Sequence, residues 1–250
     1  MTAGLTISAA NVIDGWIKAA GAVAAPGFNA DHITITADAQ WQETSAALRE
    51  LDRIALEIGT ERPSGVANML CPRVVMRPMG TTSEKISRGW EYLARGRRNG
   101  LSYSGWRDTY FERLTGHHAS KVGNPVPIKE NRLLGIIQKI NNWNHAIASS
   151  LYAHTDLPSD TLRPRGAPCL QYVQFRVFDD GTVGVTGLYR AHDYLSKALG
   201  NLIGLQRLAG FVGNETAREV SRIAVVSLVP IAQGGKGRLG RFVDGVAGTL

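Results

Sequence analysis

The sequence predicts an α+β domain in which long helices cover one face of a mixed sheet. Residues 170–178 and 183–189 read as two strands joined by an Asp-Asp-Gly turn of hairpin type. Residues 128–151 instead repeat apolar side chains at helical spacing, more clearly than any other segment. Because the chain is long enough to bury one substantial core, we expect residues 1–250 to form a single domain.

The first part of the chain alternates short helices and strands. An amphipathic pattern over residues 6–22 predicts a helix, and β-branched alternation over residues 32–36 predicts a strand. Residues 44–58 place apolar side chains at helical spacing. Three prolines within residues 62–82 indicate an irregular excursion around a short strand at 73–76.

Three further elements and a tail complete the predicted architecture. Helices are expected over residues 83–93 and 192–212 because apolar positions recur there with a helical period. Residues 223–231 form a nearly continuous apolar run, which is typical of a buried strand. The glycine-rich residues 234–250 read as a flexible tail.

The charge balance is basic, with 28 Lys and Arg against 21 Asp and Glu, a formal net charge of +7. This balance favours anionic ligands, from a nucleotide phosphate to a nucleic acid. Aromatic side chains do not alternate with the basic clusters, so the base-stacking pattern of a single-strand binder is missing. The sequence therefore argues for a small anionic ligand and against nucleic acid as the main partner.

The cysteine count and the apolar runs bear on the compartment. Only Cys71 and Cys169 occur, in unrelated contexts, which indicates reduced thiols and neither a disulfide framework nor a metal site. No run of about 18 apolar residues and no basic-then-apolar leader is present, so we expect neither a membrane span nor secretion. A cytoplasmic protein is the resulting expectation.

A possible reactive site gathers around the predicted hairpin. Cys169 lies just before the first strand, Arg190 and Asp193 follow the second, and Asn201 comes eight residues after Asp193. A thiol, a cation, a carboxylate and an amide together can attack, anchor and read one small polar ring. Three plainer interpretations stay open: a buried cysteine, a local Arg–Asp surface pair and a helix-capping asparagine.

The order of these residues resembles the thymidylate synthase family, which also includes pyrimidine hydroxymethylases. The match consists of Pro168-Cys169, the Gln174-Phe175 pair downstream, and the spacing from Arg190 through Asp193 to Asn201. The resemblance implies that Cys169 attacks C6 of a pyrimidine, that Arg190 grips the phosphate and that Asp193 is tied to the base. Asn201 would read the base and favours uracil. His192 falls on a variable position of the motif and reads as incidental.

Weaker similarities lie upstream. Glu50 falls where the family has a proton-relaying glutamate, although an exposed helix glutamate and the neighbouring Glu57 remain alternatives. Tyr103 would assist proton removal from C5, and Trp90 would form the wall of the folate site, unless it belongs to the core. The resemblance thus implies 5,10-methylenetetrahydrofolate as cofactor. It also implies a homodimer formed across the sheet face, with the apolar run over residues 223–231 as the candidate contact.

Several family features are missing. Leu170 replaces the histidine after the nucleophile, residues 144–150 lack the arginine pair that a partner subunit supplies, and the C-terminal latch is absent. A specialised transferase of a methyl or hydroxymethyl group to C5 of a pyrimidine nucleotide therefore fits better than ordinary thymidylate production. The alternative is a non-catalytic nucleotide- or nucleic-acid-binding protein on the same scaffold. Product, base and sugar stay open.

Overall fold

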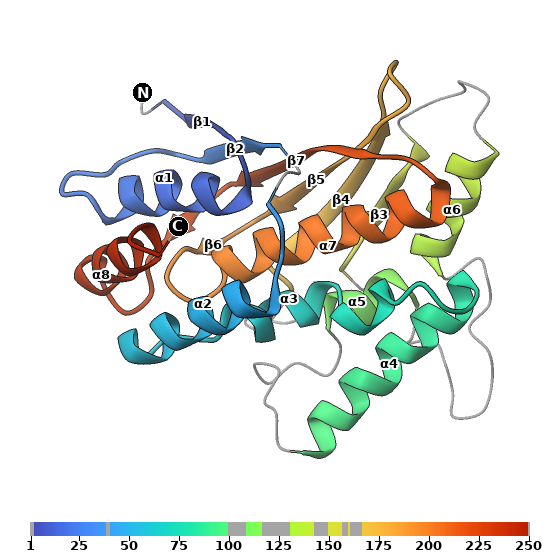
Figure 1. Ribbon diagram of the computed structural model, residues 1–250. Helices are drawn as coiled ribbons and strands as arrows, with labels where there is room; N and C mark the ends of the chain where they lie inside the picture. Colours follow the sequence, from blue (N-terminus) through green and yellow to red (C-terminus); the bar gives the residue numbers. More distant parts are fainter. Residues whose placement is uncertain are drawn as a thin grey trace.

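A mixed six-stranded sheet forms one layer of the protein, and helices gather on one of its faces (Figure 1). The computed structural model describes residues 3–38, 41–99, 109–116, 131–142, 150–156, 160 and 167–249. The strands of the large sheet are β1 (Leu5–Ala9), β2 (Ile33–Ala37), β3 (Tyr152–His154), β4 (Leu170–Val177), β5 (Val183–Tyr189) and β7 (Val220–Ser227). Two short strands, β6 (His192–Asp193) and β8 (Pro230–Ile231), pair in parallel beside it.

The helices range from one short turn to nineteen residues. They are α1 (Val12–Ala24), α2 (Ser45–Ile58), α3 (Pro63–Leu70), α4 (Thr82–Arg98), α5 (Tyr110–Leu114), α6 (Arg132–Asn141), α7 (Ala198–Thr216) and α8 (Lys236–Ala247), with a 3₁₀ turn at Arg73–Met76. The fold is thus a mixture of helices and a mixed sheet, as the sequence predicts at that level.

The strand order in the large sheet is β1-β2-β7-β5-β4-β3. The hairpin β4–β5 is antiparallel, and β5 runs parallel to β7, which α7 connects to it. Along β2, Ile33 and Ile35 are fully buried while Thr34 and Thr36 are half-buried on the opposite face. The alternation shows that one face of the sheet packs against the helices and the other does not.

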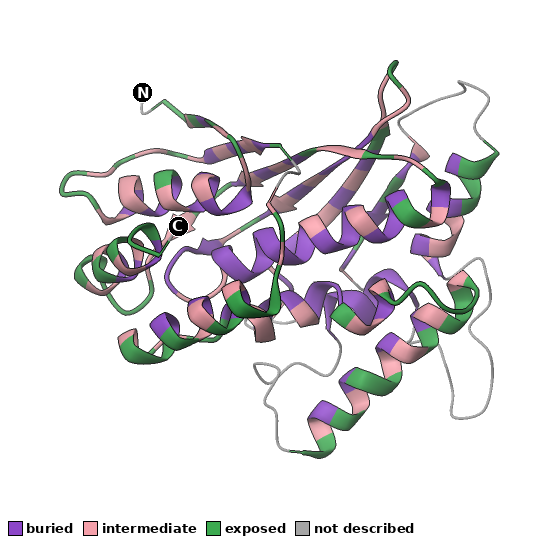
Figure 2. Ribbon diagram, in the orientation of Figure 1, coloured by how far each residue is buried: buried purple, intermediate pink, exposed green. Residues whose placement is uncertain are grey.

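Helix α7 is the central helix of the covered face, and Figure 2 shows most of it as buried. It packs against α3 so closely that a Cβ atom on Gly200 would lie 2.5 Å from Cβ of Val66. A Cβ atom on Gly204 would likewise lie 2.9 Å from Cβ of Leu70. Glycine at these two positions therefore sets the distance between the helices that bound the candidate site.

The N-terminal prediction of a helix over residues 6–22 is partly wrong. Residues Leu5–Ala9 form the edge strand β1, paired in parallel with β2. Helix α1 begins only at Val12, where the Asn11 side chain accepts hydrogen bonds from the backbone of Ile13 and Asp14. The capping asparagine marks the boundary that the apolar pattern alone misses.

Residues 62–82 are more helical than predicted. Pro63 occupies the first turn of α3, where a proline costs no hydrogen bond. Residues 73–76 form a 3₁₀ turn and not a strand. Helix α4 extends the predicted segment 83–93 at both ends, to Thr82–Arg98.

Two long predicted helices are shorter in the structure. The segment 128–151 contains α6, which ends at Asn141, while residues 143–149 lie outside the described part. The segment 192–212 begins as strand β6, and α7 starts only at Ala198. The segment 223–231 is likewise divided between β7 and β8.

The flexible tail predicted for residues 234–250 is wrong over most of its length. Residues Lys236–Ala247 form α8, with Leu239, Phe242 and Val246 buried. The Phe242 ring meets Trp16 of α1 edge-on, with 4.9 Å between ring centroids. These apolar side chains recur at helical spacing between glycines, and burial against α1 stabilises a segment that has little helix propensity of its own.

Candidate functional site

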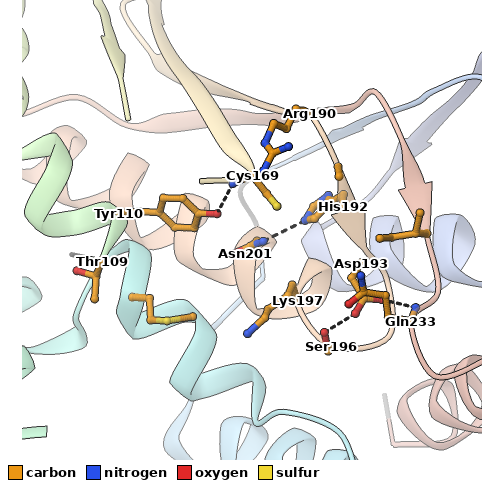
Figure 3. Close-up of a pocket in the computed structure, with 13 residues that line it drawn as sticks. Thr109, Tyr110, Cys169, Arg190, His192, Asp193, Ser196, Lys197, Asn201 and Gln233 are labelled. Atoms are coloured by element: carbon orange, nitrogen blue, oxygen red, sulfur yellow. Dashed lines mark hydrogen bonds between the residues drawn. The ribbon is translucent and has the colours of Figure 1, made fainter. Parts of the chain in front are cut away.

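A pocket of about 310 Å³ opens where β4 begins, β5 ends and α7 starts (Figure 3). Its lining combines a thiol, several polar groups and apolar side chains from segments far apart in the sequence. The lining residues are Met69, Thr109, Tyr110, Cys169, Arg190, Ala191, His192, Asp193, Ser196, Lys197, Asn201, Ile231 and Gln233. Four of the seven residues predicted for the site, Cys169, Arg190, Asp193 and Asn201, thus lie around one cavity.

The hairpin places Cys169 and Arg190 side by side. Leu170 pairs with Tyr189 across the ladder, and the Arg190 backbone N–H donates to the Cys169 carbonyl at 2.9 Å. The Arg190 side chain donates to the carbonyls of the preceding segment, from Nε to Pro168 at 3.1 Å and from Nη2 to Ala167 at 2.8 Å. Arg190 therefore holds the backbone that carries the thiol, which leaves Nη1 as the part of the guanidinium available to an anion.

Tyr110, which the sequence analysis missed, fixes the same backbone from the other side. Its hydroxyl oxygen accepts the N–H groups of Cys169 and Leu170, each at 3.2 Å. The sequence signal that places Tyr110 is a local one: Thr109 and Glu112 form a capping box that starts α5 at Tyr110. That signal predicts a helix start but not its contact with Cys169, about sixty residues away.

The half-buried Cys169 thiol is free. Burial raises its pKa above the ordinary value, the positive charges of Arg190 and Lys197 oppose that effect, and the Asp193 carboxylate adds to it. Because burial dominates, the resting group is the thiol and not the thiolate. For Cys169 to act as a nucleophile, its thiol must lose its proton when a ligand is bound.

Asp193 organises the loop beyond β6. Its Oδ1 accepts backbone N–H groups from Leu195 and Gln233, both at 3.1 Å, and its Oδ2 accepts the Ser196 hydroxyl. The described residues show no ion pair between Asp193 and Arg190, so the interpretation as a local surface pair is wrong. Asp193 joins the start of α7 to the segment after β8 and so shapes one wall of the pocket.

Asn201 lies within the first turns of α7 and does not cap it. Its backbone N–H donates to the Lys197 carbonyl at 2.9 Å, and the helix begins three residues earlier, at Ala198. The Asn201 side chain is almost fully buried, and Nδ2 lies 3.1 Å from Nε2 of His192. The capping interpretation is therefore wrong, and the amide belongs to the pocket wall.

His192, read as incidental from the sequence, contacts Asn201 directly. Its other ring nitrogen lies 2.9 Å from the Ser227 hydroxyl, and the ring is 1 % exposed. Burial lowers the His192 pKa to about 3, so the ring is neutral at physiological pH. No local pattern reveals this role, because the partners come from β7 and α7.

The other predicted site residues are not brought to this pocket. Glu50 is on α2, where the Arg53 guanidinium hydrogen-bonds it, with 3.0 Å from Nε to Oε2. The hydrogen bond from Arg53 lowers the pKa of Glu50, the opposite of what a proton relay requires. Glu57, the alternative, pairs with the same Arg53.

Of the two remaining predicted site residues, Trp90 and Tyr103, the structure describes only Trp90. Trp90 is half-buried on α4, and its Nε1 donates to the Thr115 hydroxyl at 2.8 Å. It is not among the pocket-lining residues. Tyr103 lies outside the described residues.

Within the described ranges, no group of three His, Cys, Asp or Glu side chains has a geometry that could hold a metal ion. In the same part of the chain, no helix is long and apolar enough to cross a membrane. The sequence matches no protein-family model. A comparison with curated proteins likewise finds no match.

Proposed function

We propose that the pocket binds a pyrimidine nucleotide and that Cys169 adds to C6 of the base, so that C5 can accept a one-carbon unit. The observation that carries the proposal is the convergence of a free thiol and a carboxamide in one cavity. Its volume of about 310 Å³ is at the lower end of the range for small-molecule sites, which suits a single polar ring. A thymidylate-synthase-like scaffold is part of this proposal.

The chemistry begins with loss of the thiol proton. As the Sγ–C6 bond forms, the C5–C6 π electrons move toward C5 and O4, and the proton of the thiol passes to solvent or base. The C5 carbon then attacks an electrophilic one-carbon unit and loses its own proton as the bond from that unit to its donor breaks, which leaves an exocyclic methylene on C5. A hydride or a water molecule adds to the methylene to give a methyl or a hydroxymethyl group, and the Sγ–C6 bond breaks to restore the C5–C6 double bond. Because thiolate addition is reversible, the cysteine can both form the Sγ–C6 bond in the first step and leave in the last step.

The cations near Cys169 support the first step. Lys197 and Arg190 both lower the thiol pKa, against the burial that raises it. In the ligand-free pocket, Lys197 is paired with Glu61 and Arg190 with two carbonyls. A ligand phosphate could accept a hydrogen bond from Nη1 of Arg190, which has no hydrogen-bond partner among the described residues.

The one-carbon donor implied by the resemblance is 5,10-methylenetetrahydrofolate. The residues described here do not build a site for its pterin ring, because Trp90 donates to Thr115 and does not line the pocket. Methyl and hydroxymethyl are the two products of the proposal.

A homodimer across the open face of the sheet is part of the same proposal. Val226 of β7 pairs with Thr34 of β2 and Leu188 of β5, all partly exposed on the face without helices. At the far edge, the rings of Tyr152 and Tyr172 stack with 5.5 Å between centroids, and Tyr152 is 45 % exposed. A second copy of this chain would bury this row of side chains.

Light scattering tests the dimer. The wild type should have twice the monomer mass, and Val226→Glu should dissociate it because a carboxylate would be buried at the contact. Met79→Glu, at a position 79 % exposed, is the matched control and should leave the mass unchanged. A monomeric wild type would contradict the dimer.

Release of tritium from C5-labelled nucleotides tests the proposed chemistry. The measurement uses UMP, dUMP, CMP and dCMP, each with and without methylenetetrahydrofolate. We expect release with at least one nucleotide, abolished by Cys169→Ser and retained by Cys71→Ser, since Cys71 is fully buried away from the pocket. Release at the rate of the Cys169→Ser variant for every nucleotide would refute catalysis at C5.

A second candidate function is nucleotide binding without catalysis, in a protein of the reducing cytoplasm. The raised pKa of Cys169 favours it, because a resting thiol is a poor nucleophile. In that case nucleotides bind Cys169→Ser as tightly as the wild type, and no tritium is released. Tighter binding to the wild type together with C5 exchange favours the transferase.

A further inference from the structure

A chain of buried polar side chains runs from the pocket into the core. Asn201 Nδ2 lies 3.1 Å from His192 Nε2, and His192 Nδ1 lies 2.9 Å from the Ser227 hydroxyl. The Ser227 hydroxyl lies 3.1 Å from that of Tyr194. Because all four residues are almost fully buried, each hydrogen bond in the chain restricts the next.

The direction of the first bond fixes the histidine tautomer. An amide nitrogen can only donate, so Nε2 of the neutral ring is the acceptor and Nδ1 carries the proton. The Nδ1–H group then donates to the Ser227 hydroxyl, which shares a further hydrogen bond with the Tyr194 hydroxyl. The lowered His192 pKa agrees with a neutral ring, since a charged imidazolium would have no acceptor site for Asn201.

The imidazole has little freedom to turn. The Tyr189 ring stacks on it with 4.0 Å between centroids and 1° between planes, and the Tyr194 ring lies at 5.3 Å. The His192 backbone is held as well, because its N–H donates to the Val229 carbonyl at 2.9 Å and β6 pairs with β8. The acceptor nitrogen therefore occupies a fixed place beside Asn201.

This arrangement decides which end of the Asn201 amide the pocket offers. With Nδ2 turned to His192, Oδ1 has no partner among the described residues, and the residue lines the cavity (Figure 3). An exposed carbonyl oxygen selects a ring N–H and disfavours a ring nitrogen that carries a lone pair. Uracil presents an N–H at N3, and cytosine presents a lone pair there.

We propose that His192 is a specificity-determining positioning residue, which orients the Asn201 amide so that the pocket accepts uracil and rejects cytosine. This inference rests on the proposed function for the pyrimidine site. It assigns base choice to the residue that hydrogen-bonds the base-reading amide. It also explains why an uncharged histidine is buried beside Asn201 in the pocket lining.

The first test is the tautomer of His192 in the ligand-free wild type, read from ¹⁵N chemical shifts and assigned by comparison with His192→Gln. We expect a neutral ring protonated at Nδ1. A ring protonated at Nε2 would need Oδ1 of Asn201 against it, with the N–H groups facing the pocket. That result would overturn the inference without requiring any ligand.

The second test is base discrimination by calorimetry with UMP and CMP and their deoxy forms. The wild type should prefer the uracil nucleotide by about tenfold or more, as expected for a pocket with one mismatched polar group. In His192→Gln the side-chain amide oxygen can accept from Asn201 in place of Nε2, so the preference should persist. In His192→Asn the shorter amide reaches only toward Ser227, and the preference should fall to near unity.

The outcomes separate the two proposals. An unchanged preference in a folded His192→Asn variant would overturn the role of His192 and leave the pyrimidine site intact. A wild type that binds none of the nucleotides would overturn the proposed function and the base choice with it. The Nδ1–H tautomer would then remain as a purely structural property.

Discussion

The neutral state of His192 makes the stability of the fold depend on pH. Burial lowers its pKa to about 3, whereas the same group in the unfolded chain titrates near its ordinary value of about 6.5. Between these values the unfolded state binds more protons, so the free energy of unfolding falls as the pH falls. The contribution of His192 to the free energy of unfolding is fully present above about pH 6.5 and is lost as the pH falls toward about 3.

The size of the effect follows from linkage. Going from about pH 7.5 to about pH 5, the difference in pKa contributes a loss of about 2 kcal/mol, as an order of magnitude. Carboxylates contribute little over this interval because they titrate mainly below it. His192 should therefore contribute more than the carboxylates to the pH dependence in this window.

Urea denaturation at several pH values measures this loss. The wild type should lose about 2 kcal/mol between the two ends of the window, and His192→Gln should lose much less whatever its absolute stability. His154→Gln, at a side chain 55 % exposed, is the matched control and should keep the wild-type slope. Equal slopes in wild type and His192→Gln would refute the account of a buried, neutral histidine.

Two other predictions concern the thiol and the helix packing. Alkylation of Cys169 by iodoacetamide, followed by mass spectrometry, should be slow at neutral pH because burial raises the pKa of the thiol. The rate should rise only in alkaline solution, while the fully buried Cys71 stays unmodified. Rapid reaction of Cys169 at neutral pH would contradict this. Gly200→Ala should cost about 1–3 kcal/mol in urea denaturation, since the new methyl group would lie 2.5 Å from Val66, whereas Gly21→Ala, with nothing within 4 Å, should be neutral or stabilising. Equal stability of the two variants would show that α3 and α7 are not in tight contact.

Local sequence patterns predicted which residues of the site lie next to the β4–β5 hairpin. The alternation of β4 and β5 and their tight turn fix Cys169 beside Arg190, and the helix that follows brings Asn201 to the same cavity. Spacing along the chain is enough here because neighbouring strands and the next helix pack together. The prediction for these residues combined this short-range geometry with the similarity of their order to that of the thymidylate synthase family.

The missed features depend on contacts between distant segments. Tyr110 reaches Cys169 from α5, and His192 acquires its role from Ser227 on β7. Helix α8 is stabilised by burial against α1 and not by its glycine-rich composition. Glu50 failed for the complementary reason, since helical spacing cannot tell whether a carboxylate faces a cavity or Arg53.

The proposed function depends on a covalent adduct between Cys169 and a pyrimidine. Intact mass spectrometry after incubation with 5-fluoro-UMP, 5-fluoro-dUMP and 5-fluoro-dCMP, with and without methylenetetrahydrofolate, tests it most directly. We expect a mass increase equal to the nucleotide, or to nucleotide plus folate, that maps to Cys169 and disappears in Cys169→Ser but not in Cys71→Ser. An unmodified mass with every probe, or an adduct that maps elsewhere, would contradict it.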